Sequence, residues 1–219
     1  MNNLQEGVSD ALRRIGMPVL EHPIFYNAPV GIRFEIGGEE EVYIGGWHDG
    51  GRNLVNKKYL KGAFDRAKAI YDHLPHRPDI LRIDTYPGTG AGVETDVLKK
   101  VLKMGLPDPQ EQKTEEFLPA GEKDTIVRCQ LYWDISKILF SPDSLLREII
   151  RADFGGISGL VSNVFFINAG DAVLFHLYDD RGADLVAADK EMLRPIYDRY
   201  NQWVLDYDRL KIETLFAKC

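Results

Sequence analysis

Two short acidic segments near the carboxyl end of the chain hold the side chains best suited to chemistry. HLYDDRGADL, residues 176–185, carries three aspartates and one arginine, and LDYDR, residues 205–209, carries two aspartates and another arginine. Carboxylates that converge from both segments could bind a hard divalent cation such as magnesium, which prefers oxygen ligands. Such an ion would support phosphoryl-transfer or hydrolytic chemistry. The ligands in this hypothesis are Asp180, Asp184, Asp206 and Asp208.

A structural role for these segments is the favoured interpretation. Asp179 can accept a hydrogen bond from the backbone two residues further on, and Gly182 suits the left-handed position that closes a hairpin turn. Arg181 and Arg209 would each hold carboxylates through forked hydrogen bonds and fasten the last helices to this hairpin. Clusters of opposite charge are more often paired networks than catalytic sites, so we expect the acids and arginines to neutralise one another.

His176 lies in an apolar stretch just before the turn, where its imidazole could act as a general base beside Asp180. A hydrogen-bonded histidine on a partly buried sheet face is the favoured alternative. Cys129 and Ser158 are not expected to be nucleophiles, because the first has no adjacent base and the second lacks the strand-turn-helix spacing of a hydrolase.

The glycine-rich stretch YPGTGAGVET, residues 86–95, falls between an expected strand and an expected helix, where backbone amides can bind phosphate. Its spacing matches neither the dinucleotide-binding fingerprint nor the Walker loop, which also needs a lysine that this stretch lacks. The stretch therefore favours a flexible connection.

The elements that position these residues follow from hydrophobic periodicity. A strand over 30–38 alternates apolar residues with Arg33 and Glu35, which indicates one buried face and one wet face, and residues 41–47 are expected to return as its partner. Residues 105–124 combine three prolines with many acids and amides, so we expect a long exposed loop there. Strands expected over 163–168, 172–178 and 183–188 form a three-strand meander.

The remaining pattern predicts helices that pack on these strands. The expected helices cover 4–15, 60–74, 95–102, 142–150 and 190–204, with a last one within 208–218, and further strands are expected over 80–86 and 125–133. Residues 1–219 are therefore expected to form a single α+β domain, with a mostly antiparallel sheet and helices packed on that sheet.

Composition excludes several classes of function. Lys and Arg number 27 against 34 Asp and Glu, so the formal net charge of −7 would repel a nucleic-acid backbone. No apolar run reaches the roughly 20 residues that span a bilayer, and the first residues lack the pattern of a signal peptide. We therefore expect a cytoplasmic protein that binds neither nucleic acid nor membrane, and no cofactor is expected. Two cysteines cannot build a disulfide framework or a cysteine-rich zinc site.

The carboxyl-terminal region 160–217 also resembles a known family. Residues 164–209 are similar to the signature region of a bacterial family classified only as a domain of unknown function, and residues 26–37 and 59–74 resemble its amino-terminal part. The mark of that region is a Tyr-Asp-Asp-Arg-Gly-x-Asp motif followed by a tryptophan and an Asp-Tyr-Asp-Arg tail. The matching residues are Tyr178, Asp179, Asp180, Arg181, Gly182, Asp184, Trp203, Asp206, Asp208 and Arg209. The resemblance implies a bacterial cytoplasmic protein and brings no activity, substrate or catalytic residue.

Two functional hypotheses follow. The first is a non-enzymatic acidic protein-binding or regulatory module, of which an immunity-type inhibitor is one form, whose negative surface meets a basic protein partner. The alternative is a divalent-metal-dependent enzyme that uses the carboxyl-terminal carboxylates. A purely structural scaffold is a third hypothesis. The first is favoured, so catalysis is not expected.

Overall fold

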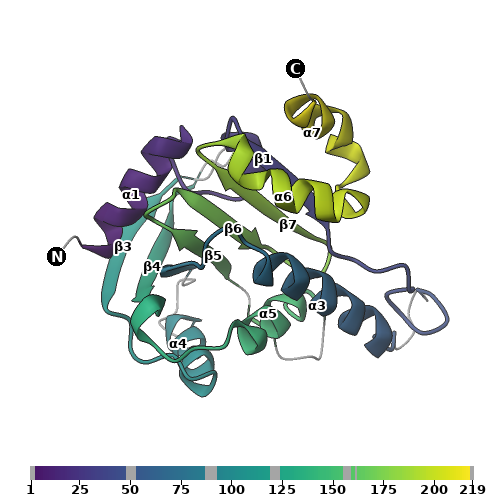
Figure 1. The fold of residues 1–219 in the computed structure, drawn as a ribbon. Coiled ribbons are helices and arrows are strands. Elements are labelled where there is room, and N and C mark those ends of the chain that lie inside the picture. The colour runs from purple at the N-terminus through teal and green to yellow at the C-terminus, as the bar shows by residue number, and fades with distance from the viewer. Residues whose placement is uncertain are drawn as a thin grey trace.

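The computed structural model describes residues 3–47, 53–86, 93–118, 124–154, 159–160 and 162–217. Within these residues, seven strands form one sheet in the order β1-β7-β6-β5-β2-β4-β3, with helices packed against it (Figure 1). Every pair of neighbouring strands is antiparallel. The α+β class predicted from the sequence, with its antiparallel sheet and packed helices, is confirmed.

The elements have the following bounds. The strands are β1 (Gly31–Glu35), β2 (Ile80–Thr85), β3 (Glu111–Phe117), β4 (Ile126–Asp134), β5 (Asn163–Asn168), β6 (Val173–Leu177) and β7 (Gly182–Ala187). The α-helices are α1 (Leu4–Ile15), α2 (Ile24–Asn27), α3 (Lys57–Asp72), α4 (Val93–Lys103), α5 (Pro142–Ile150), α6 (Lys190–Tyr200) and α7 (Arg209–Phe216). Short 3-10 helices are η1 (Ile135–Lys137), η2 (Asn201–Trp203) and η3 (Asp206–Asp208).

The first helix shows how local sequence fixes the boundaries. The side chain of Asn3 accepts a hydrogen bond from the backbone N–H of Gln5 at 2.9 Å, which caps the start of α1. Gly16 follows the last turn with a φ of 85°, a left-handed conformation that glycine adopts without steric cost. The helix buries Val8 and Ala11 against the sheet.

Alternating side chains on the strands divide the core into two layers. On one face, Leu81 and Ile83 of β2 join apolar residues of α3, α5 and α6. On the opposite face, Ile80 joins apolar residues of α1 and of the segment 17–28. Figure 1 shows α1 apart from α3, α5 and α6, on the other side of the sheet. Burial on both faces explains why β5, β6 and β7 are almost wholly apolar.

The carboxyl-terminal strands form the meander that the sequence predicts. β5 pairs with β6 and β6 with β7, with Phe166 opposite Phe175 and His176 opposite Asp184. β7 then pairs with β1, which places Arg33 opposite Asp184. The partner of β1 is therefore β7, and the expectation that residues 41–47 would pair with β1 was wrong. Those residues leave the sheet, and within the described part of the chain their strand pairing is limited to the isolated bridge between Tyr43 and Val55.

The stretch 105–124 is not the continuous exposed loop that its composition predicts. Residues Glu111–Phe117 form strand β3, which pairs with β4 from Glu111 opposite Tyr132 to Phe117 opposite Ile126. An edge strand exposes much of its surface and can carry charges that a central strand could not. Pairing with β4 therefore outweighs a composition with low strand propensity.

Within the part of the chain that the structure describes, no helix has the length and apolar character that crossing a membrane requires.

Candidate functional site

The turn between β6 and β7 places the motif residues 178–182 at one end of the sheet. Asp179 Oδ1 accepts hydrogen bonds from the backbone N–H of Arg181 at 2.7 Å and of Gly182 at 3.3 Å. The bond from Arg181 is the contact that the sequence predicts for Asp179. The backbone carbonyl of Arg181 accepts the N–H of Ile36 at 2.8 Å, which ties this turn to the residues that follow β1.

Gly182 is needed for space and not for a left-handed conformation, which corrects the sequence-based expectation. Its φ is not in the left-handed region, and it begins strand β7. The ring of Tyr178 lies beside it, so a β-carbon at Gly182 would collide with the hydroxyl oxygen and Cζ of Tyr178. Only glycine leaves room for this ring.

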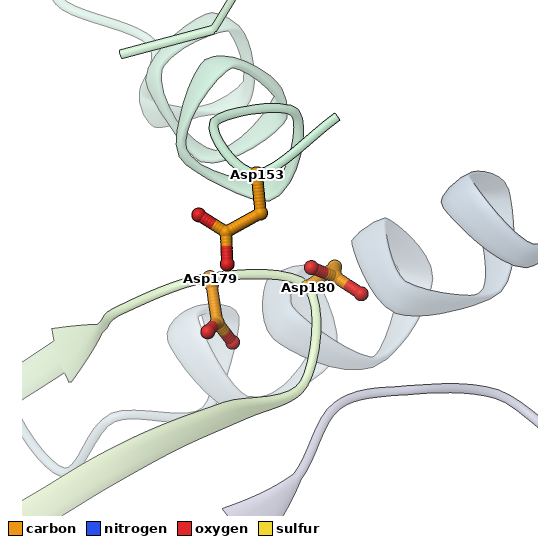
Figure 2. A group of neighbouring side chains, drawn as sticks. All are labelled: Asp153, Asp179 and Asp180. Carbon is orange, nitrogen blue, oxygen red and sulfur yellow. The ribbon is translucent and has the colours of Figure 1, made fainter. Parts of the chain in front are cut away.

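Three carboxylates meet at the turn. Asp153, which follows α5, and Asp179 and Asp180 of the turn each place an oxygen within 4.8 Å of the other two (Figure 2). We call these three residues the carboxylate cluster. Arg181 donates from Nε to Asp179 Oδ2 at 2.8 Å and from Nη2 to Asp153 Oδ2 at 3.0 Å. Its side chain is nevertheless 71% exposed, so water screens these ion pairs.

Asp180 bonds a tyrosine. Its Oδ2 accepts a hydrogen bond from the hydroxyl of Tyr59, at the start of α3, at 2.6 Å. Burial raises the pKa of Asp180, and burial together with the bond to Asp180 raises the pKa of Tyr59. The tyrosine therefore stays protonated and donates, which anchors the turn to α3.

The four carboxylates proposed as metal ligands do not converge. Asp184 is fully buried and pairs with Arg33, whereas Asp206 is 91% exposed and bonds Arg209 within its own turn at 2.9 Å. Asp208 accepts the hydroxyl of Tyr26 at 3.0 Å. Of the proposed set, Asp180 alone belongs to the carboxylate cluster.

Arg33 makes the connection that the sequence analysis assigned to Arg181 and Arg209. Its Nε and Nη2 donate to the two oxygens of Asp184 at 2.8 and 3.2 Å, and its Nη1 lies 3.9 Å from Asp208 Oδ2. Arg33 therefore joins β1, the hairpin and η3. The wet face predicted for it was wrong, because α2 and the residues before α7 cover β1 and leave Arg33 8% exposed.

Neither predicted arginine fastens the last helices to the hairpin. Among the contacts of the described residues, the side chain of Arg181 bonds only within the carboxylate cluster. Arg209 donates to the backbone carbonyls of Asn201 at 3.2 Å and Val204 at 2.7 Å, so it stabilises the connection between α6 and α7. Trp203 in the same connection stacks on Tyr200, with ring centroids 4.7 Å apart.

His176 occupies the sheet face as a buried residue. Its Nδ1 lies 2.8 Å from the carbonyl oxygen of Val164, and its ring stacks on Phe165 with centroids 4.5 Å apart. Burial lowers its pKa to about 3, so the imidazole is neutral at physiological pH. The side chain is fully buried and Asp180 bonds Tyr59 instead, so the geometry favours the structural alternative for His176.

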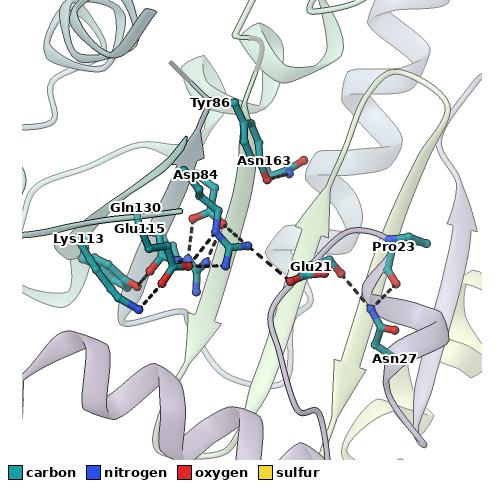
Figure 3. Close-up of polar contacts among 12 residues, drawn as sticks. Glu21, Pro23, Asn27, Asp84, Tyr86, Lys113, Glu115, Gln130 and Asn163 are labelled. Carbon is teal, nitrogen blue, oxygen red and sulfur yellow. Dashed lines mark hydrogen bonds and ion pairs between the residues drawn. The ribbon is translucent and has the colours of Figure 1, made fainter. Parts of the chain in front are cut away.

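A second polar network on the same sheet face was missed by the sequence analysis. Arg82 donates to both oxygens of Asp84 at 2.6 and 2.7 Å, and Arg128 bonds Glu115 of β3. Gln130 also donates to Glu115 at 2.7 Å (Figure 3). Alternate positions of β2, β3 and β4 build this network, and no local motif marks it, because its members come from strands that are distant in sequence.

Other residues considered above are placed as follows. Cys129 is fully buried, and Gln112 Nε2 lies 3.4 Å from its sulfur. Residues 87–92 of the glycine-rich stretch, Ser158 and the final Cys219 lie outside the described residues.

Comparison with known proteins places most of the chain in one family. The model of a family described as "Domain of unknown function (DUF3885)" matches residues 8–208. "Uncharacterized protein YnaE" of Bacillus subtilis (strain 168) is 43% identical over 57 residues, which are 26% of this chain and 27% of that protein. The chain thus aligns with about a quarter of the length of this relative. No solved structure matches the chain.

Proposed function

The chain belongs to the DUF3885 family, a domain of unknown function, and from this premise we propose that it is a non-enzymatic, acidic protein-binding module for a basic partner. The carboxylate cluster is the observation that carries this proposal. Three carboxylates lie within 4.8 Å of one another, and Arg181 is the one cation that bonds them among the described residues. The cluster therefore holds more carboxylates than cations, and Asp153 presents its carboxylate to solvent.

A basic partner would relieve this excess charge. Asp153 is 55% exposed and Arg181 is 71% exposed, so both are accessible to a partner. Complementary charge would speed the encounter and exclude acidic competitors, and the net charge of −7 acts in the same direction at longer range.

An immunity-type inhibitor in the cytoplasm is the specific form of this function that we propose. Such an inhibitor must recognise its target quickly, and an acidic surface against a basic enzyme achieves this through electrostatic steering. We also propose that the motif over residues 178–184 marks the family, since its residues form the turn that holds the cluster.

The test compares two neutralising variants that remove the same charge at different places. Asp153→Asn alters the cluster, whereas Asp206→Asn alters an exposed aspartate that also pairs with an arginine, Arg209, but lies outside it. Each purified variant is used to capture proteins from an extract of the host bacterium at low and at raised salt.

We expect a basic protein to be captured by the wild type and by Asp206→Asn, and less of it by Asp153→Asn and at raised salt. Equal capture by both variants, or capture that salt does not weaken, would contradict the proposal.

A further inference from the structure

Between β1 and the start of α3, residues 42–44 and residues 54–56 pair with each other away from the sheet, and we call these two paired segments the hairpin (Figure 1). The backbone N–H of Asn56 donates to the carbonyl of Val42 at 2.9 Å, and the N–H of Ile44 donates to the carbonyl of Leu54 at 2.9 Å. Tyr43 bridges to Val55 between these two bonds. The hydrogen bonds hold residues 42–44 against 54–56 and fix the side chains that both segments carry.

Large apolar side chains on this hairpin face the solvent. Ile44 and Trp47 are each 63% exposed, and Leu54 is 61% exposed. Single exposed apolar residues are normal on a protein surface, but a group of them marks an interaction site. The direct backbone bond between Ile44 and Leu54 places these two residues side by side, and Trp47 lies against the ring of Tyr43, the residue that precedes Ile44. We call Ile44, Trp47 and Leu54 the apolar patch.

Aromatic side chains connect the patch to the rest of the fold. The ring of Tyr43 lies 5.2 Å from the ring of Trp47 and 6.3 Å from that of Phe154, measured between centroids. Phe154 is buried and lies 6.4 Å from the ring of Tyr59, the residue that bonds Asp180. A chain of rings thus links the patch to the carboxylate cluster, and Asp153 of that cluster precedes Phe154 directly.

Exposed acidic side chains lie on residues near the patch. Glu39, Glu40 and Glu41 are exposed in the residues that lead into the hairpin, and Asp153 is exposed beside Phe154. The carbonyl of Glu41 accepts the side-chain N–H of Asn56 at 2.9 Å, which fixes this acidic run against the hairpin base. Negative charge therefore borders a patch that is itself uncharged.

From this arrangement we propose that the apolar patch is the docking surface for a protein segment in which lysine or arginine residues flank a large apolar side chain. The apolar side chain packs on Trp47 and Leu54, and the flanking cations pair with Glu39–Glu41 and Asp153. A cation that reaches the face of the Trp47 ring gains a further attraction from the ring quadrupole. The inference rests on the proposed function and adds the place and chemistry of the contact.

The test uses a defined probe with purified full-length protein. The probe is a short fluorescent peptide in which lysines flank a single phenylalanine, and its binding is measured by anisotropy at low salt. Two further peptides replace the phenylalanine by alanine or the lysines by glutamates. The protein variants are Trp47→Ala in the patch and Leu139→Ala as the matched control, since Leu139 is a fully exposed apolar residue on the loop before α5.

We expect Trp47→Ala to weaken binding of the lysine–phenylalanine peptide by about tenfold, the loss typical of an interface anchor. Leu139→Ala should bind as the wild type does, and the two altered peptides should bind the wild type more weakly. Because Trp47 is largely exposed, its truncation should leave the melting temperature unchanged.

The outcomes separate this inference from the proposed function. Equal binding by Trp47→Ala and Leu139→Ala overturns the docking surface, and the proposed function survives if Asp153→Asn still loses the captured partner. Equal binding of the lysine and glutamate peptides overturns the basic chemistry of the segment. If the peptide binds at the patch but Asp153→Asn captures as much partner as the wild type does, the proposed role of the carboxylate cluster is wrong instead.

Discussion

Arg33 and Asp184 form a forked ion pair between β1 and β7, with Nε–Oδ1 and Nη2–Oδ2 distances of 2.8 and 3.2 Å. The pair lies under the ring of Tyr26, whose centroid is 4.7 Å from the guanidinium carbon. The backbone N–H of Phe25 also donates to Asp184 Oδ2 at 3.1 Å. The carboxylate is thus satisfied inside the fold, which offsets the cost of removing its charge from water.

Removing one member of this pair should be strongly destabilising. Arg33→Met keeps the length of the side chain but leaves Asp184 buried without its cation, at a cost of about 3–5 kcal/mol in the free energy of unfolding. Arg13→Ala is the matched control, because its pair with Asp10 is exposed and contributes about 1 kcal/mol or less. Urea denaturation measures both. A loss below that of the control would show that the buried pair does not hold the sheet edge.

Gly182 should not tolerate even one added carbon. Alanine at this position places its β-carbon against the ring of Tyr178, and such overpacking costs about 1–3 kcal/mol. Gly170→Ala is the control, since the nearest atom to a β-carbon there is 3.6 Å away. The cost of Gly182→Ala should shrink in a Tyr178→Ala background, because the clash is then removed. Additive losses in the double variant would point to a backbone cause instead.

The parts of the fold that the sequence predicts are those with a local signal. Apolar runs between turn residues mark β5, β6 and β7, and apolar residues at helical spacing mark α1 and α6. β3 has no such signal, because hydrogen bonds from β4 stabilise a charged segment that would not form a strand alone.

The candidate site was less predictable for the same reason. Arg33 and Asp184 are 151 positions apart, and nothing near either residue indicates the other. The sequence places Asp179 and Asp180 in a turn, but Asp153 joins them only because the end of α5 packs beside that turn. Long-range packing therefore decides which acids meet.

His176 should make the protein sensitive to acid. Its pKa falls from the ordinary 6.5 to about 3 in the folded state, so between these values the unfolded chain binds a proton that the folded protein does not. The contribution of His176 to the free energy of unfolding is therefore fully present above pH 6.5. It declines as the pH falls through this window, by up to about 1.4 kcal/mol per pH unit.

The variant His176→Gln removes this titration and keeps a polar group near the Val164 carbonyl. Its free energy of unfolding should be lower than that of the wild type at neutral pH. Between pH 7 and pH 5 it should change less than that of the wild type does. A slope unaltered in His176→Gln would assign the acid sensitivity to other groups.

The carboxylate cluster should bind divalent cations poorly as long as Arg181 is present. Its guanidinium occupies oxygens of Asp153 and Asp179 that a metal ion would need, so manganese should raise the melting temperature of the wild type little. Arg181→Ala frees these oxygens and should respond more strongly to manganese, whereas Arg209→Ala, which leaves the cluster intact, should behave as the wild type does. Strong stabilisation of the wild type that Asp153→Asn abolishes would instead favour the metal-dependent alternative, with Asp153, Asp179 and Asp180 as the ligands.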